Sequence, residues 1–170
     1  DVFFRDSRSI KNTDFWVSYS FLDTERDYLN FPTRATPIFA SKHNASAVAK
    51  RWFPKITTSM GLTYAFVSPR PYNDPNTNEF NGGRTKAYHD VSFNASYLTN
   101  IWDNFTIIHL SVSNILGLNQ EFGYRFSNTP DVNGQFTGIA IRPPARQFFF
   151  IGVFVSIGQR VNLTAEEILN

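Results

Sequence analysis

The 170-residue sequence contains no cysteine, which excludes a disulfide framework and any metal or redox site built from thiolates. It also lacks a run of basic residues. The formal net charge is only +2 and the Lys and Arg residues are scattered, so we expect no nucleic-acid partner. Gly-x-Ser-x-Gly and His-Glu-x-x-His motifs are missing as well. We therefore expect neither catalysis, nor a cofactor, nor a metal site.

A long apolar segment is also missing. The longest apolar run, Phe148 to Val155, is far shorter than the roughly 18 residues that mark a transmembrane helix. Aromatic residues make up 16% of the chain and charged residues only 18%, a composition that disfavours intrinsic disorder. A membrane-spanning β-barrel has no long apolar run either, because lumen-facing polar residues interrupt every strand. The modest mean hydropathy of −0.27 is therefore compatible with such a barrel.

The most regular pattern in the chain is an alternation of apolar and small or polar residues between Ile56 and Val67. One side of the predicted strand is formed by Ile56, Thr58, Met60, Leu62, Tyr64 and Phe66. A period of two predicts a long β-strand with one apolar face. Strands in soluble domains usually have about five or six residues, whereas a tilted strand that crosses a bilayer needs roughly 9–11. The length of the pattern favours a membrane-embedded strand.

Similar alternation recurs along the chain and predicts an all-β, antiparallel, up-and-down sheet of about seven strands. We expect these strands at 1–6 (incomplete), 14–22, 42–53, 56–68, 87–98, 106–116 and 146–157, with a further short strand at 122–126. The residues expected to face lipid are Ile56, Met60, Leu62, Tyr64, Val91, Phe93, Tyr97, Ile108, Leu110, Val153 and Val155. In a soluble barrel or sandwich, the alternative fold, the same face would form a core.

The connections between the expected strands alternate between short and long. Residues 7–13, 54–55 and 99–105 form short turns, whereas 23–41, 69–86 and 117–145 are long and polar. Outer-membrane barrels have short periplasmic turns and longer extracellular loops. The sorting therefore predicts a location in the cell outer membrane, with the long loops extracellular and the short turns and the C-terminus periplasmic.

Aromatic residues gather at strand ends beside the three short turns. They are Phe15, Trp16, Trp52, Phe53, Trp102 and Phe105. Trp and Tyr prefer the membrane–water interface, so we predict that all three tryptophans lie in one girdle. A lysine at Trp52 would then be tolerated, since its amine can reach water. The alternative is that these aromatic side chains close the end of a soluble barrel.

Several stretches, taken in order and spacing, resemble the C-terminal barrel wall of TonB-dependent outer-membrane receptors, in the branch that often carries an N-terminal carboxypeptidase-like domain. The stretches are Asp14–Asp27, Ser41–Pro54, Thr63–Tyr72, Tyr97–Asn100, Val112–Gly117 and Pro143–Ile157. The resemblance implies a wall segment of a plugged, 22-stranded barrel. It also implies TonB-dependent uptake of a scarce nutrient such as an iron chelate, a glycan or a peptide.

The resemblance also implies a set of partners. They are outer-membrane lipid, the remaining strands and plug of the same receptor, an inner-membrane energy-coupling protein acting through the plug region, the barrel-assembly machinery, and a surface lipoprotein or larger envelope complex. Seven strands cannot close a barrel of this type, and unpaired backbone groups facing lipid are costly. We therefore expect a segment of a longer protein, with residues 1–158 in the barrel and 159–170 in a periplasmic tail. Thr164 and Glu167 in that tail could cap a short helix.

The last expected strand carries a candidate assembly signal. Gly152, Val155 and Ile157 are similar to the glycine-x-x-apolar-x-apolar pattern that the barrel-insertion machinery reads, although Phe150 stands where a polar residue is usual. A lipid-facing final strand of any kind could contain the same pattern.

The loop from Arg70 to Arg84 offers candidate ligand-binding residues at the expected mouth of the barrel, because function concentrates on loops that a rigid wall carries. The candidates are Arg70, Tyr72, Asp74, Asn78 and Arg84. Surface decoration without a binding role is the alternative. The oxygen spacing around Asp74 resembles a calcium loop, but the required glycine and bidentate glutamate are absent, so a turn explains it. His109 belongs to the polar set of its strand, where we expect it to form hydrogen bonds.

Function remains open between several classes at this point. A passive outer-membrane barrel, an adhesin or a structural subunit of an envelope complex would share the wall pattern. A soluble β-barrel or sandwich that binds a ligand is the further alternative.

Overall fold

The fold is seen in a computed structural model that describes residues 1–29, 31 and 34–158. It is all-β. Its strands are β1 (Val2–Asp6), β2 (Thr13–Phe21), β3 (His43–Phe53), β4 (Thr58–Val67), β5 (Pro71–Tyr72), β6 (Gly83–Arg84), β7 (Tyr88–Ile101), β8 (Asn104–Ser113), β9 (Gly123–Phe126), β10 (Gly138–Ile141) and β11 (Phe148–Ser156). A 3₁₀ turn, η1 (Pro54–Ile56), joins β3 to β4. The described part of the chain has no helix that is long and apolar enough to cross a membrane.

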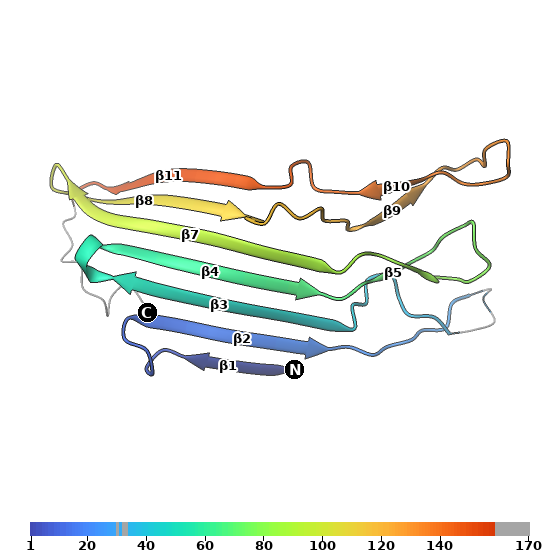
Figure 1. The fold of residues 1–170 in the computed structure, drawn as a ribbon, viewed down its shortest axis with the longest axis horizontal. Helices are drawn as coiled ribbons and strands as arrows, with labels where there is room; N and C mark the ends of the chain where they lie inside the picture. Colours follow the sequence, from blue (N-terminus) through green and yellow to red (C-terminus); the bar gives the residue numbers. More distant parts are fainter. Residues whose placement is uncertain (30, 32–33, 159–170) are drawn as a thin grey trace.

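Seven of these strands form one large sheet in sequence order, β1-β2-β3-β4-β7-β8-β11, and every neighbouring pair is antiparallel (Figure 1). The predicted up-and-down order of seven strands is therefore confirmed. The additional short strand near residues 122–126 is confirmed as β9, which pairs with β10. The β5–β6 pair within the second long connection was not predicted.

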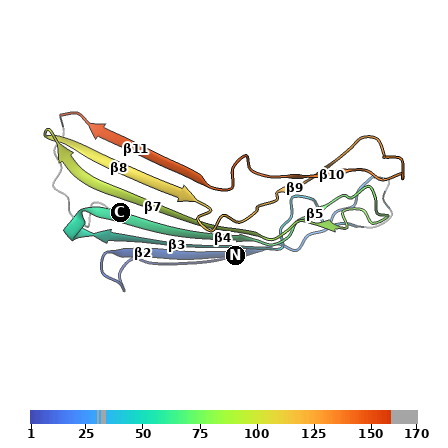
Figure 2. The same cartoon turned by 45° about the horizontal axis from the view of Figure 1, so that its top comes forward.

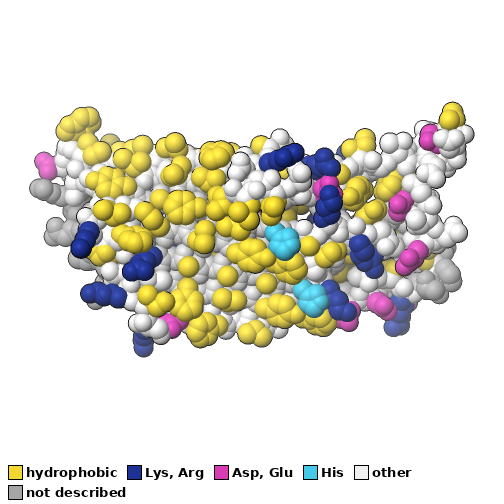
Figure 3. All heavy atoms as spheres, viewed as in Figure 1, with side chains coloured by type: hydrophobic (Ala, Val, Ile, Leu, Met, Phe, Trp, Pro, Cys, Tyr) yellow, Lys and Arg dark blue, Asp and Glu magenta, His cyan; other side chains and the backbone are white. Residues whose placement is uncertain are grey.

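One face of the sheet is apolar across all of its central strands. Leu62 of β4 pairs with Ala49 of β3 and Phe93 of β7, and Phe93 pairs in turn with Val112 of β8. The register places every residue of the expected apolar face on this side, apart from one. Ile56 is the exception, because proline at the start of η1 and the left-handed backbone of Thr57 delay the strand until Thr58. Figure 3 shows this face largely covered by apolar side chains.

On the opposite face, β4 and β7 carry mostly small, polar side chains. Gly61, Thr63 and Ser59 of β4 lie opposite Asn94, Ser92 and Ser96 of β7. Serine hydroxyls meet across strands, as for Ser18 and Ser46 at 2.7 Å. The expected hydrogen-bonding role of His109 is confirmed, since its Nδ1 lies 2.8 Å from the Ser96 hydroxyl.

The seven-stranded sheet is a single curved layer, with the long connections extending beyond one end of the strands (Figure 2). The strands of this sheet make extensive contacts only with the neighbouring strands to which they are hydrogen-bonded. Among the described residues, the large sheet buries only two apolar side chains, Trp52 and Leu98. Leu62, in the middle of β4, is 49% exposed. The sheet therefore has no hydrophobic core of its own on either face.

The connections are sorted by length between the two ends of the sheet. Residues 7–12, 54–57 and 102–103 form the short turns at one end, and 22–42, 68–87 and 114–147 form the long connections at the other (Figure 1). The turn predicted at 99–105 is too long. Trp102 and Asp103 both have positive φ, at 47° and 58°, which builds the two-residue hairpin turn that matches strand twist. As a result, β7 extends to Ile101 and β8 begins at Asn104.

The predicted single girdle of three tryptophans is wrong. Trp52 is 1% exposed and lies on the polar face, because it shares its side of β3 with Val48 and Lys50, whereas Ala49 lies on the apolar side. Trp16 pairs with Val48 and shares that face. Trp102 is 92% exposed at the tip of the β7–β8 turn. All three residues do lie near the short-turn end, but their position within the two-residue period separates them.

Only part of the candidate assembly signal lies within the last strand. Gly152 and Val155 belong to β11, whereas Ile157 follows the end of the strand. The expected tail helix falls within residues 159–170, outside the described residues.

Candidate functional site at the long-loop end

The three long connections contact one another beyond the strand ends. Asn76, in the 68–87 connection, pairs with Phe136 of the 114–147 connection: its amide Nδ2 donates to the Phe136 carbonyl at 3.0 Å, and its Oδ1 accepts from the Phe136 backbone N–H at 2.7 Å. The 22–42 connection joins through Phe31, whose ring stacks on Phe80 at a centroid distance of 3.8 Å. Asn81 also donates to the Thr36 carbonyl at 3.1 Å. These contacts build one structured loop region rather than three separate loops.

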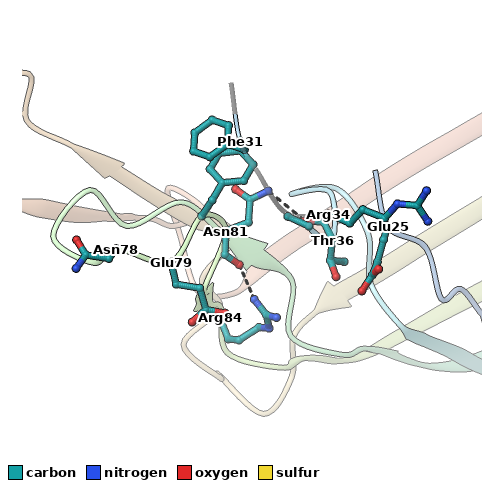
Figure 4. A pocket seen from close by; sticks show the side chains of 10 residues that line it. Glu25, Phe31, Arg34, Thr36, Asn78, Glu79, Asn81 and Arg84 are labelled. Atoms are coloured by element: carbon teal, nitrogen blue, oxygen red, sulfur yellow. Dashed lines mark hydrogen bonds between the residues drawn. The ribbon is translucent and has the colours of Figure 1, made fainter. Parts of the chain in front are cut away.

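A cavity of about 570 Å³ lies between the first two long connections (Figure 4). It is lined by Glu25, Phe31, Arg34, Ala35, Thr36, Asn78, Glu79, Phe80, Asn81 and Arg84. The lining combines guanidinium, carboxylate and amide groups with two stacked aromatic rings. Such a lining can hydrogen-bond a polar ligand on several sides and pack against its apolar surface.

Local contacts hold the two arginines of this cavity in different ways. Arg84 is held in β6, where its Nη1 donates to the carbonyls of Asn81 and Gly83 at 2.7 and 3.0 Å. Asn81 is buried and has a positive φ of 55°, a conformation that Asn tolerates better than most residues. Arg34 forms an exposed ion pair with Asp27 at 3.1 Å. The backbone of the 68–87 connection therefore fixes Arg84, while Arg34 stays on the surface.

The structure brings together only two of the five predicted ligand residues, because Asn78 and Arg84 line this cavity. Arg70 lines a smaller cavity of about 200 Å³ and donates from Nη2 to the Phe122 carbonyl at 3.0 Å. Tyr72 packs against the ring of Tyr124, with the centroids 4.6 Å apart. Asp74 accepts the backbone N–H of Asn76 at 2.9 Å, which is a turn contact. Ligand binding by the five residues stays a prediction.

Sequence reasoning missed the contribution of the first long connection. Glu25, Arg34 and Thr36 reach the cavity although they are more than forty residues from Arg84 in the sequence. No local pattern marks them. The only signal in the sequence is the order of the connections. Every second connection of an up-and-down sheet lies at the same end, which places 22–42 and 68–87 together.

A second cluster centres on Glu121, whose side chain is only 3% exposed. Its Oε1 accepts hydrogen bonds from Arg142 at 2.7 Å and Lys86 at 3.3 Å, and its Oε2 accepts the Tyr124 hydroxyl at 3.0 Å. The hydrogen bond from Arg142, followed by that from Tyr124, lowers the pKa of Glu121 below its ordinary value. The hydrogen bond to Glu121 raises the pKa of Tyr124. One buried carboxylate thus joins the second and third long connections.

The third connection is anchored to the wall by Asn114. This residue is 2% exposed and has a positive φ of 50°. Its amide donates to the carbonyls of Leu118 and Arg146 at 2.8 and 2.7 Å, so it closes the turn after β8 and holds the chain that enters β11. The loop end is therefore positioned by buried polar contacts with satisfied partners.

No protein-family model, curated protein or solved structure matches this chain.

Proposed function

We propose that this chain is part of the wall of an outer-membrane β-barrel receptor that takes up a scarce nutrient in a TonB-dependent manner. The observation that carries the membrane part is the open apolar face. It spans β2 to β11, and Leu62, Tyr97, Leu110 and Val153 on it are each more than a third exposed. Soluble proteins rarely leave an apolar surface of this extent in water. An apolar face of this extent is suited to contact with lipid.

The dimensions of the strands support the same proposal. In the large sheet, the six strands that follow β1 have between 9 and 14 residues. A tilted strand needs roughly 9–11 residues to cross a bilayer. The sorting of short turns and long connections to opposite ends is also typical of outer-membrane barrels. We propose that the short turns face the periplasm and the long connections face the exterior.

The number of strands supports a wall segment rather than a complete barrel. Because the seven strands of the large sheet are antiparallel to their neighbours, the two edge strands β1 and β11 run in the same direction. Pairing β11 with β1 of the same or another copy would therefore create a parallel junction, whereas single-chain bacterial barrels have an even number of antiparallel strands. An odd number of further strands from the same receptor would complete the barrel.

Transport rather than passive support is favoured by the resemblance together with the loop-end cavity. In this proposal, Asn78, Arg84 and Glu25 at the mouth contact a polar cargo before it enters the lumen. The small side chains that β4 and β7 carry on the polar face would leave room for a plug and for passage of cargo. An iron chelate, a glycan and a peptide all have the polar groups that this lining can bind.

Two experiments test the proposal with the intact protein that contains this chain. We expect the protein to remain in the membrane pellet after carbonate washing and to need detergent for extraction. Recovery in the carbonate-soluble fraction would contradict the membrane location. We also expect cargo uptake by cells to collapse when the inner-membrane energy-coupling protein is deleted. Unchanged uptake in that deletion would identify a passive barrel.

A further inference from the structure

The apolar face is not even, because it has a groove along β3. The β3 residues on this face, Ala45, Ala47 and Ala49, have one-carbon side chains. The neighbouring strands carry Phe15, Val17 and Tyr19 on one side and Leu62, Tyr64 and Phe66 on the other. A cavity of about 380 Å³ lies over Ala47 and Ala49 of this row, and its lining on this face includes Phe15, Val17, Leu62 and Tyr64.

Positive charge lies at the short-turn end of the groove. Arg51 follows Ala49 on the same side of β3 and pairs in register with Thr13, which lines the groove. The Arg51 guanidinium lies 5.4 Å from the centroid of the Phe53 ring. Within the described ranges, no carboxylate forms an ion pair with Arg51, nor with Lys11 or Lys55 in the adjoining turns. The end of the groove is thus complementary to an anion.

We propose that this groove binds one acyl chain of a glycerophospholipid and that Arg51 binds the phosphate of the same molecule. The proposal rests on the proposed membrane location and names a specific lipid partner of the wall. From Arg51 to Ala45, the row extends over roughly 20 Å at the usual rise of a strand, a length that suits a fatty acyl chain. Guanidinium groups form bidentate, charge-assisted hydrogen bonds with phosphate oxygens.

The position of Arg51 assigns the lipid to one leaflet. Arg51 lies near the short turns, so the phosphate would be at the periplasmic surface and the acyl chain would extend along β3 toward the bilayer centre. At this depth an arginine can keep its charge at the headgroup level while its stem lies against apolar groups.

The test measures lipid binding to the intact, detergent-purified protein by native mass spectrometry, with dipalmitoyl phosphatidylglycerol as the probe. We expect one lipid to bind more tightly than the rest. Arg51→Gln should weaken this binding by about tenfold, as expected for one charge-assisted contact. Ala47→Leu should weaken it similarly by filling the groove. Ala95→Leu, on the same face in β7, and Arg125→Gln, in the outer β9–β10 hairpin, are matched controls that should have no effect.

Three other results would each contradict binding of a phospholipid in this groove. Equal binding by all variants, or equal loss in Ala47→Leu and Ala95→Leu, would mean that only non-specific surrounding lipid is present. Displacement of the lipid by inorganic phosphate, with no effect of Ala47→Leu, would mean an anion site without an acyl groove. A change in oligomeric mass on Ala47→Leu would mean that a second copy occupies the groove. If Ala47→Leu does not fold, Ala49→Val replaces it.

Failure of this inference can be distinguished from failure of the proposed function. A protein that needs detergent for extraction but binds no preferred lipid contradicts only the groove proposal. A protein that is released by carbonate contradicts the membrane wall itself.

Discussion

The two faces of the large sheet have opposite surroundings although they are built from alternate residues of the same strands. On β4, Leu62 points to the apolar face and is half exposed, while its neighbour Gly61 points to the polar face against Asn94. The contacts of the apolar face are those between its own neighbouring strands, such as the hydrogen bond of Tyr64 with His89, whereas the polar face also buries Trp52. A residue's side of the strand, more than its position along the strand, therefore decides what a substitution costs.

The largest effect should come from the packed end of the polar face. Trp52→Ala should destabilise the protein by about 3–5 kcal/mol, since it empties the space of a fully buried aromatic side chain. Trp102→Ala is the control, because Trp102 is almost fully exposed and its loss should change stability by less than about 0.5 kcal/mol. Urea unfolding of the detergent-folded protein measures both. Similar costs at the two sites would mean that the tryptophans share one environment after all.

The next largest effect should come from the apolar face. In a bilayer, Leu62→Arg near the middle of β4 should cost roughly 2–4 kcal/mol. Ser111→Asn, on the polar face of β8, should be tolerated. If water covered the apolar face, the half-exposed Leu62 could be replaced at little cost. A Leu62→Arg variant as stable as the Ser111→Asn variant, by heat-modifiable migration or urea unfolding, would therefore argue against lipid on this face.

A smaller effect should come from crowding on the polar face at Gly61. A Cβ at this position would lie 2.8 Å from the side-chain amide of Asn94, so Gly61→Val should cost about 1–2 kcal/mol unless that side chain moves. Asn94→Ala in the same protein should recover much of the loss. A double-mutant cycle by urea unfolding measures the coupling. Additive effects of the two substitutions would contradict a direct contact.

The smallest effect on global stability should come from the loop end. Because the pKa of Glu121 is lowered in the folded protein, its contribution to stability is complete above its ordinary value of 4.5 and is lost as the pH falls through the folded pKa. Glu121→Gln should make residues 114–147 sensitive to limited proteolysis at neutral pH, while the wall stays folded. Glu25→Gln, at an exposed residue of the first long connection, is the control. Equal protection of Glu121→Gln and the parent protein would contradict the anchoring role.

The strand order could be predicted because each large strand carries its own two-residue period, as between Thr58 and Val67. The loop-end site could be predicted only in part. Asn78 and Arg84 are recognisable as loop residues, but Glu25 and Arg34 reach the same cavity through the return of the chain after β3 and β4. Their meeting depends on contacts over long separations, such as the ring stack of Phe31 on Phe80, which no local pattern encodes.

Sequence by itself determined the all-β class, the order of the strands and the composition of the apolar face, because backbone geometry turns alternate side chains to opposite sides wherever a strand forms. Only the tertiary structure decided which residues each neighbouring strand supplies. Strand pairing placed the alanines of β3 between the large side chains of β2 and β4, and contacts between the long connections joined the Glu121 carboxylate to Lys86 and Arg142. Pairing across strands and between loops depends on turn lengths and on contacts remote in the chain, which the two-residue period does not specify.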